Sequence, residues 1–320
     1  MLNKGQEILL KLEDTDLDRS LEAFLARRSR WFPGGDWRKG LPQFEISVDG
    51  QMARLDQILR RGQQVELFRK PWQEPEVPMD IEVVFEDRDL LVVDKPSGLP
   101  SLPQGDYLEH TLLFQLREQF GNPLLTPSHR LDMETSGLMM LAKHAETRGW
   151  FQSQFQAGDV LKRYEALVFG LWPKSLTSVA IPLVKDPVIY TKFVPGEHGK
   201  TARTEVLDIG HFGEFSWLVL KPVTGRTNQL RAHLAAAGHP IVGDKKYHRE
   251  PNVFLDWLAH RDWRQLESEL RLPRQALHCR TLGCRLREGH WRQWRSRRET
   301  QSTWLSLAGL AHRGSCPSMA

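Results

Sequence analysis

Cysteine and long apolar runs are both scarce in this sequence of 320 residues. Its three cysteines, Cys279, Cys284 and Cys316, are an odd number and form no Cys-x-x-Cys pair, so neither a disulfide framework nor a thiolate zinc site is expected. No apolar run is long enough to cross a bilayer, and early acidic residues argue against a signal peptide. We therefore expect a cytoplasmic protein with no membrane partner.

The sequence also lacks the spacings that bind a catalytic metal. Its 12 histidines include no His-x-x-x-His pair, so we expect no metal site. Lysine and arginine exceed aspartate and glutamate by 44 to 40, a net charge of only +4, and the pI is near 9.0. This balance suggests a polyanionic partner but does not establish one. The length suggests one large domain and one smaller domain.

Three prolines in "KPWQEPEVP" hold the chain extended, as in a linker, and predict three parts: residues 1–76, 77–282 and 283–320. The first part contains leucines at helical spacing from residue 17, followed by the expected strands "FEISVDG" and "QQVELF". Two interpretations of it stay open, a solvated helix face or an RNA-binding module that contacts phosphates and bases. The basic and aromatic residues in question are Arg27, Arg28, Arg30, Trp31, Trp37, Arg38 and Lys39.

The middle part reads as strand-rich with a few helices, which predicts an α+β fold. Strands are expected at "IEVVFEDRDLLVVDKPSG", "YEALVFG" and "FSWLVLK", and a helix from about residue 112 to 120. From residue 285 to 298 the expected alternation of apolar residues gives way to arginines. This last part could be a disordered basic tail, a divergent closing strand, or a sequence altered by a reading error.

A carboxylate stands before a buried strand in "HRLDMETSGLMMLAK". Burial raises the pKa of a carboxyl group, so an ionised Asp132 needs a cation within a few ångströms. "SWLVLKPVTGRTNQLRAHLAAAGHPIVGD" reads as strand, turn and helix, with Thr227 as the N-cap and Gly238 after the last turn. Arg231 flanks the apolar face of that helix. Either its guanidinium group pairs with an anion, or the aliphatic part of the side chain packs while the guanidinium group reaches water.

Three segments in this order, "HRLDMETSGLMMLAK", "KRYEALVFG" and "VTGRTNQLRAHLAAAGHPIVGDKKY", resemble the signature motifs of the RluA-type pseudouridine synthase family. The resemblance covers roughly residues 80 to 280. It implies a mixed, mainly antiparallel sheet and an isomerase that converts uridine in folded RNA to pseudouridine without a cofactor. Residues 17–70 are similar to the small S-four-like α+β module that precedes such domains. We expect a monomer acting on ribosomal RNA or, second, transfer RNA.

The resemblance also assigns roles within the site. Asp132 matches the catalytic aspartate, Tyr164 the active-site tyrosine, and Arg231 the arginine that pairs with the aspartate. A flipped uracil would stack on Tyr164, whose hydroxyl could help to move the C5 proton, while Arg130 fills the vacated place in the RNA. The predicted RNA contacts are Arg130, Arg226, Thr227 and Asn228.

The sequence departs from the family's pattern at Asn228, where histidine is common, and in "LPSLPQG", where a histidine is also expected. His129 and Lys95 are interpreted as structural residues, the latter as part of a turn. Two other functions stay open. One is an RNA-binding protein without activity, and the other is a hydrolase using Ser136 or Asp132, which would lack a Gly-x-Ser-x-Gly elbow. The target uridine is not encoded in any recognisable pattern.

Overall fold

A computed structural model describes residues 2–28, 36–189, 191–250 and 252–309. The chain forms two compact units, of which the first is Met1–Glu76 with Leu102–Gln115 and the second is Val77–Ser101 with Leu116–Ala320. Three residues used in the sequence interpretation, Arg30, Trp31 and Cys316, lie outside the described residues. Both units combine helices with sheets.

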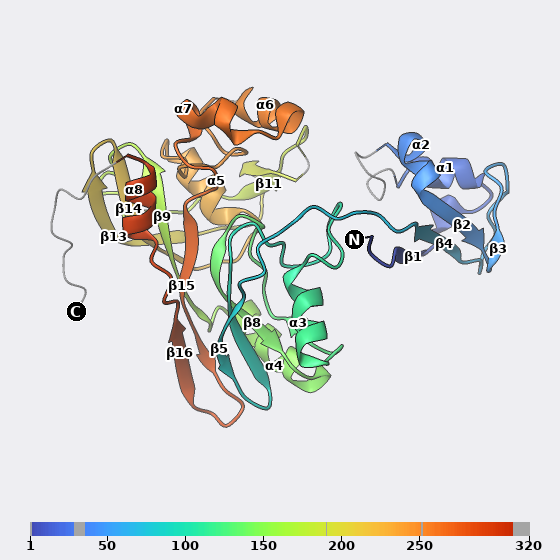
Figure 1. Cartoon of the computed structure of the whole chain (residues 1–320), viewed down its shortest axis with the longest axis horizontal. Coiled ribbons are helices and arrows are strands. Elements are labelled where there is room, and N and C mark those ends of the chain that lie inside the picture. The colour runs from blue at the N-terminus through green and yellow to red at the C-terminus, as the bar shows by residue number, and fades with distance from the viewer. Residues whose placement is uncertain (1, 29–35, 190, 251, 310–320) are drawn as a thin grey trace. The chain divides into compact units, whose positions relative to one another are not determined.

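The first unit is built on a four-stranded antiparallel sheet in the order β1-β4-β2-β3 (Figure 1). Asp49 and Gly50 both have positive φ angles at the β2–β3 turn, the conformation that a two-residue hairpin requires. One face of the sheet packs on α1 around Phe24 and Leu67. The bounds are β1 Gln6–Leu10, α1 Leu21–Ala26, α2 Trp37–Gly40, β2 Phe44–Val48, β3 Gln51–Met52 and β4 Val65–Arg69, with short 3-10 helices at Asp14–Asp16 and Leu41–Gln43.

Several basic and aromatic residues of this unit make contacts within the protein that the RNA-binding interpretation did not consider. Trp37 lies in the core, so its ring is not available to stack on a base. Arg27 and Arg28 both donate to the buried Asp16, and Arg28 also covers the ring of Phe24 at 3.8 Å. An aromatic ring of this size is found in the core because burying its large apolar area is favourable. That this unit binds RNA stays a prediction.

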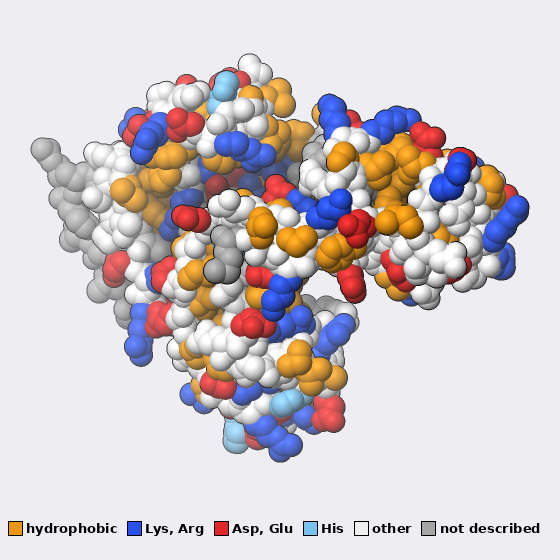
Figure 2. Space-filling view, turned by 45° about the vertical axis from the view of Figure 1, so that its right-hand side comes forward, with side chains coloured by type: hydrophobic (Ala, Val, Ile, Leu, Met, Phe, Trp, Pro, Cys, Tyr) orange, Lys and Arg blue, Asp and Glu red, His pale blue; other side chains and the backbone are white. Residues whose placement is uncertain are grey.

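Basic side chains do not gather into a single patch on the face drawn in Figure 2. Lysine and arginine are interspersed there with aspartate and glutamate. This distribution agrees with the small net charge of +4. On this face, attraction for a polyanion therefore depends on local groups of cations and not on a uniform field.

Residues 102–115 pack with the first unit although the sequence assigned them to the second part. Glu74 accepts three backbone hydrogen bonds from residues 108 to 110, at 2.8 to 2.9 Å, and another from Asn3 at 2.7 Å. Arg69 donates to Asp106 and to the carbonyl of Gly105, at 2.8 Å each. A single proline-rich boundary near residue 76 therefore misses two further crossings of the chain between the units.

The second unit contains a ten-stranded, mainly antiparallel sheet in the order β10-β13-β14-β9-β15-β8-β6-β5, with β16 beside β15 and β7 beside β8. This is the mixed α+β fold that the sequence predicted (Figure 1). The strands are β5 Glu82–Glu86, β6 Leu90–Lys95, β7 Thr126–Pro127, β8 Ser136–Ala142, β9 Leu161–Phe169, β10 Ser178–Val179, β13 Thr204–Phe212, β14 Phe215–Pro222, β15 Leu277–Arg285 and β16 Trp291–Arg295.

Helices and one small hairpin complete the second unit. Helix α3 spans Leu112–Phe120, as the apolar spacing predicted, and begins within the segment that packs with the first unit. The remaining elements are α4 Ala145–Ala157, the hairpin of β11 Leu183–Lys185 and β12 Phe193–Pro195, α5 Gln229–Ala236, α6 Asn252–His260, a 3-10 helix Trp263–Leu266, α7 Glu267–Leu270 and α8 Gln301–Leu307. No helix of the described segments is both long and apolar enough to span a membrane.

Strands β8 and β15 form the parallel pair at the centre of the sheet, with Ser136 opposite His278 and Gly137 opposite Cys279. Gly137 has a φ of +110°, and a Cβ there would lie 2.4 Å from the carbonyl oxygen of Cys279 and 2.5 Å from its nitrogen. Only glycine allows this close approach of two backbones. The pair places the end of the "HRLDMETSG" loop beside a strand from near the end of the chain.

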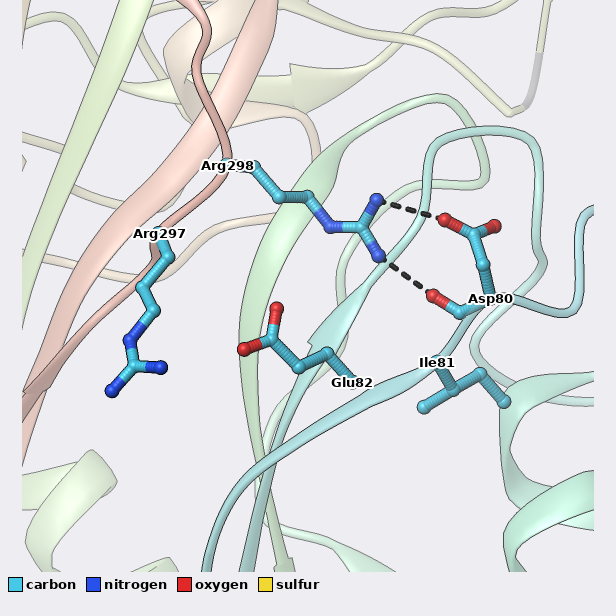
Figure 3. Close-up of a pocket in the computed structure, with 5 residues that line it drawn as sticks. All are labelled: Asp80, Ile81, Glu82, Arg297 and Arg298. Carbon is cyan, nitrogen blue, oxygen red and sulfur yellow. Dashed lines mark hydrogen bonds and ion pairs between the residues drawn. The ribbon is translucent and has the colours of Figure 1, made fainter.

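The sheet continues past residue 283, where the sequence placed the start of a basic tail. Strand β15 runs to Arg285, β16 pairs with it, and α8 follows, while residues 310–320 lie outside the described ones. Arginines are accommodated in this region because they form ion pairs with acidic residues from distant parts of the chain. Arg280 donates to Glu165 at 2.6 and 2.8 Å, and Arg298 donates to Asp80 at 2.9 and 2.7 Å (Figure 3).

Candidate active site

A cleft of about 720 Å³ opens in the second unit between the loop before β8, the start of β9 and the turn before α5. All seven residues that the sequence predicted as site residues line it. They are Arg130, Asp132, Tyr164, Arg226, Thr227, Asn228 and Arg231. Three separated stretches of sequence therefore meet at one cavity.

Asp132 is held through one of its two oxygens. Nη1 of Arg231 donates to Oδ2 at 2.6 Å, and the side-chain amide of Asn228 donates to the same oxygen at 2.8 Å. Oδ1 accepts no hydrogen bond from the described residues. The carboxylate is thus fixed in place while one oxygen is left for a reacting atom.

The same contacts keep Asp132 ionised. Burial by itself would raise the pKa of this carboxyl group, but the charge of Arg231, the hydrogen bonds from Arg231 and Asn228, and the charge of Lys246 lower it below its usual value. Arg231 remains protonated. Burial opposes its charge, yet Asp244 and Asp132 raise its pKa well above the ordinary value.

A second carboxylate, Asp244, anchors Arg231 from the other side. Its oxygens accept from Nε and Nη2 of Arg231 at 2.6 and 2.8 Å, and Oδ1 also accepts the backbone N–H groups of Lys246 and Tyr247. Asp244 is completely buried. This clamp leaves Nη1 as the nitrogen that meets Asp132. The sequence interpretation missed Asp244, although it lies near the end of the third recognised segment, in "VGDKKY".

Three side chains from residues 95 to 101 hold the backbone of the Asp132 loop. Ser101 Oγ donates to the carbonyl of Leu131 at 2.7 Å, Lys95 Nζ to that of Met133 at 3.0 Å, and Ser97 Oγ to that of Glu134 at 2.7 Å. Carbonyls of an irregular buried loop need such partners because no sheet supplies them. The segment "DKPSGLPS" is therefore a support for the loop that carries the carboxylate.

Lys95 is more than a turn residue, contrary to its sequence interpretation. It is completely buried at the end of β6, and Nζ also donates to the carbonyls of Pro96 and Leu99 at 2.9 and 2.7 Å. Burial lowers its pKa to about 7, although the negative charge of Asp132 works in the opposite direction. Little in the sequence indicates this role, because a Lys-Pro pair before glycine is also typical of an exposed turn.

Tyr164 faces the cleft from β9 and is almost fully buried. Its neighbour across the sheet is Cys279 of β15. Burial, Cys279 and the charge of Asp132 together raise the pKa of Tyr164 well above its ordinary value. The hydroxyl therefore keeps its proton at neutral pH, and the ring supplies a flat apolar surface.

His129 is structural, as the sequence predicted. The backbone N–H of Met140 donates to its Nε2 at 3.2 Å, and its ring stacks on Phe155 with centroids 4.9 Å apart. Burial, helped by the charge of Lys162, lowers its pKa to about 3, so the ring is neutral. A neutral imidazole in this position accepts a hydrogen bond from the strand and carries no charge into the cleft.

The turn before α5 differs from its prediction in one detail. The N-cap of α5 is Asn228 and not Thr227, and Asn228 has a φ of +53°. Asparagine tolerates this left-handed conformation better than most residues, and here its amide serves Asp132 instead of capping the helix. Arg130, Arg226 and Thr227 are exposed at the rim of the cleft, and contact with RNA by these residues stays a prediction.

A second hollow, lined by Asp80, Ile81, Glu82, Arg297 and Arg298, lacks comparable chemistry (Figure 3). Arg298 crosses it to contact Asp80, so its charge is matched within the chain. Among the described residues, no three side chains of histidine, cysteine, aspartate or glutamate gather to hold a metal ion. The cleft around Asp132 is the stronger candidate.

Comparisons with known proteins point to one family. The profile of a family described as RNA pseudouridylate synthase matches residues 89–236. An uncharacterized RNA pseudouridine synthase of Synechocystis sp. is 37% identical over 213 residues, which are 66% of this chain and 73% of that protein. The ribosomal large subunit pseudouridine synthase D of Pseudomonas aeruginosa is 30% identical over 292 residues, 88% of each chain.

Two further comparisons extend this likeness. The mitochondrial tRNA pseudouridine(32) synthase of Saccharomyces cerevisiae is 32% identical over 235 residues, which are 72% of this chain and 50% of that protein. Among solved structures, human RNA pseudouridylate synthase domain containing 1 has a TM-score of 0.57 at 27% identity, covering 73% of this chain and 90% of that one. The sequence comparisons and the structural comparison therefore point to the same family of proteins.

Proposed function

The chain belongs to the RluA-type family of RNA pseudouridine synthases and is an isomerase acting on RNA, and we propose that it works through Asp132 on a uridine flipped into the cleft. The observation that supports this proposal is the different hydrogen bonding of the two carboxylate oxygens of Asp132. Oδ2 of Asp132 is bound by Arg231 and Asn228, whereas Oδ1 accepts no hydrogen bond from the described residues, and the residue lines the cleft.

The chemistry rearranges bonds without oxidation and imports no group. The bond from N1 of uracil to C1′ of the ribose breaks, the base turns, C5 bonds to C1′, and the C5 hydrogen leaves as a proton while N1 gains one. An ionised carboxylate can attack the sugar, attack the base or remove a sugar proton. Oδ1 of Asp132 serves each of these routes, because all require an unprotonated oxygen near the glycosidic bond.

Tyr164 and Arg130 have separate tasks in this mechanism. Tyr164 stacks on the uracil and keeps it against Asp132, and its protonated hydroxyl hydrogen-bonds to the base while the C5 proton moves. A uracil in a helix cannot reach the cleft, so the nucleotide must be flipped at a cost of a few kcal/mol. Arg130, exposed at the rim, fills the vacated place because its planar guanidinium stacks on bases.

The substrate that we propose is ribosomal RNA, with transfer RNA as the second candidate. The relative with the widest coverage named above acts by its name on the ribosomal large subunit, and the yeast relative by its name on tRNA. A cytoplasmic location and a monomeric state remain predictions, since one of these relatives is mitochondrial.

Tritium release tests the proposed function. Unmodified ribosomal and transfer RNA transcripts labelled with tritium at uracil C5 are incubated with the full chain, and the released tritium is counted. An enzyme that replaces the C5 hydrogen with a glycosidic bond releases it, whereas an RNA-binding protein without activity and a hydrolase do not. Pseudouridine mapping in cells with and without the gene then identifies the uridine.

Two outcomes would contradict the proposal. RNA binding without tritium release from any cellular RNA would leave an inactive RNA-binding protein. Release of free uracil or of RNA fragments would instead indicate a hydrolase.

A further inference from the structure

Lys162 is a cation in the cleft that the proposed chemistry does not use. It lies two residues before Tyr164 on β9, so both side chains point to the same face of the sheet. Both line the cleft, and Lys162 lies on the side of Tyr164 toward the turn between α4 and β9. The residue between them, Arg163, is exposed on the opposite face.

Lys162 is 9% exposed and has no partner of opposite charge. Of the residues that the structure describes, none places a carboxylate or another hydrogen-bond acceptor against its Nζ. Nζ lies over the ring of Phe155, whose centroid is 5.8 Å away. Burial lowers the pKa of this lysine, because the surrounding side chains solvate an ammonium group less well than water does.

The acidic side chain that lines the cleft together with Lys162, Asp132, is bound to Arg231. Glu165 lies on the opposite face of β9 and is bound to Arg280 at 2.6 Å. A lysine with so little exposed surface and no anion beside it is unusual, because lysine is rarely buried unless it is paired. Lys162 therefore has the surroundings of a residue whose partner arrives with the substrate.

We propose that Lys162 binds a phosphodiester of the flipped nucleotide, forming an anion subsite beside the uracil site. This inference rests on the proposed function only for the identity of the anion. Successive residues on one face of a strand are about 6 to 7 Å apart, a span comparable to that from a pyrimidine base to its own phosphate. With uracil on Tyr164, the backbone of the same nucleotide passes Lys162.

The proposed subsite predicts how the thermal stability of the protein without RNA changes when Lys162 is replaced. Replacing Lys162 with methionine keeps the length of the side chain and removes the uncompensated charge. The melting temperature of Lys162→Met should therefore equal or exceed that of the natural protein, because no ion pair is lost and a buried charge is removed. A lysine kept for structure would give the opposite result, a clear loss of stability.

The binding test uses a small probe that needs no flipping from a helix. The dinucleotide UpU is compared with its methylphosphonate analogue, which differs by one negative charge, and affinities are measured by NMR titration of the full chain. The natural protein should prefer UpU by about tenfold, the order of one charged hydrogen bond. Lys162→Met should lose this preference, and Lys162→Arg should restore most of it.

Lys174→Met is the matched control, because Lys174 is exposed and does not line the cleft. It should keep the preference for UpU. On a full RNA substrate, Lys162→Met should also reduce the slope of log affinity against log salt by about 0.7, the contribution of one phosphate contact on a single strand.

Each result has a definite meaning. Equal affinity of the natural protein for the two dinucleotides, or no loss of preference in Lys162→Met, would overturn the subsite. Tritium release with an unchanged salt slope in Lys162→Met would keep the proposed function and reject the subsite. A charge preference that depends on Lys162, without isomerisation of any RNA, would keep the subsite and reject the proposed function.

Discussion

The two oxygens of Asp132 have different surroundings, and this difference predicts the effect of replacing it. In Asp132→Asn, Arg231 keeps both hydrogen bonds to Asp244, so the fold and the affinity for RNA should change little. The amide neither ionises nor attacks, and tritium release should fall by at least the 10² to 10⁴-fold typical of a lost acid or base group. Turnover that persists after deamidation has been excluded by mass spectrometry would remove Asp132 from its role.

Replacing Arg231 should change the pH dependence of turnover. Burial raises the pKa of Asp132 and Arg231 lowers it, so Arg231→Met should move this pKa upward. The reaction needs the ionised carboxylate, which then exists only at higher pH. Activity in Arg231→Met should be lost most at low pH and recover partly as the pH rises.

The measurement is kcat/KM for tritium release from about pH 5 to pH 9. Because Arg231→Met leaves Asp244 buried without its partner, the double variant Arg231→Met with Asp244→Asn is the companion that protects folding. A profile reduced equally at every pH would show instead that Arg231 contacts the RNA.

Tyr164→Phe separates the ring of Tyr164 from its hydroxyl. The ring remains available to stack on uracil, so KM should change little, whereas kcat should fall by about 10² to 10⁴-fold if the hydroxyl takes part in moving the C5 proton. Deuterium at C5 should then slow the variant more than the natural enzyme. A variant with raised KM and normal kcat would assign the hydroxyl to binding alone.

At the scale of residues, functional groups could be predicted from sequence where the residue type and its local sequence context were enough to suggest a role. Asp132 and Arg231 stood out because a carboxylate before a buried strand needs a cation. Lys95 and Asp244 did not, because their importance lies in partners that only the fold supplies. Nothing near Lys95 in the sequence indicates that it will contact the carbonyl of Met133, which lies in the loop before β8.

At the scale of elements, the pairing of β8 with β15 depends on a single glycine. A side chain at Gly137 would collide with the backbone of Cys279, which cannot move as a side chain can. Gly137→Ala should lower the free energy of unfolding by about 3 kcal/mol or more, from clash and positive φ together. Urea denaturation of this variant measures the loss.

Gly121 is the control for this prediction. Its φ is also positive, at +57°, but a Cβ there would meet nothing within 4 Å. Gly121→Ala should therefore cost only about 1 to 2 kcal/mol, the price of the backbone conformation. Similar losses in the two variants would mean that close approach to Cys279 is unimportant.

Elements with a strong apolar pattern could be predicted from sequence, and those stabilised by distant polar partners could not. Helix α3 and strand β8 lie where their apolar residues indicated. Strand β16 carries arginine and tryptophan in place of a regular apolar alternation, so composition suggested a tail. The N-cap of α5 was displaced because Asn228 bonds to Asp132, a contact between residues 96 positions apart.

At the scale of the whole molecule, the first unit should contribute to RNA affinity through its exposed cations. Arg38 and Lys39 have side chains 71% and 86% exposed, and their ion pairs are on the surface, where such pairs are weak. The double variant Arg38→Gln with Lys39→Gln should weaken RNA binding and reduce its salt slope, while the catalytic rate at saturation stays unchanged.

Substitution in the full chain is a sharper test than deletion of residues 1–76. Deletion would also remove Arg69 and Glu74, the partners of residues 102–115. The control is Arg54→Gln with Lys70→Gln, which removes two other cations of this unit. Unchanged affinity and salt slope in both double variants would show that the module binds no RNA through these cations.

The order of strands in the large sheet has a consequence for synthesis of the protein on the ribosome. Strand β15 lies between β8 and β9, yet it is made more than a hundred residues after both. Until it emerges, a growing chain presents two unpaired strand edges, each able to pair with another chain. Chains interrupted before residue 277 should therefore aggregate, and completing the last quarter of the polypeptide joins the two halves of the sheet and gives Tyr164 its neighbour.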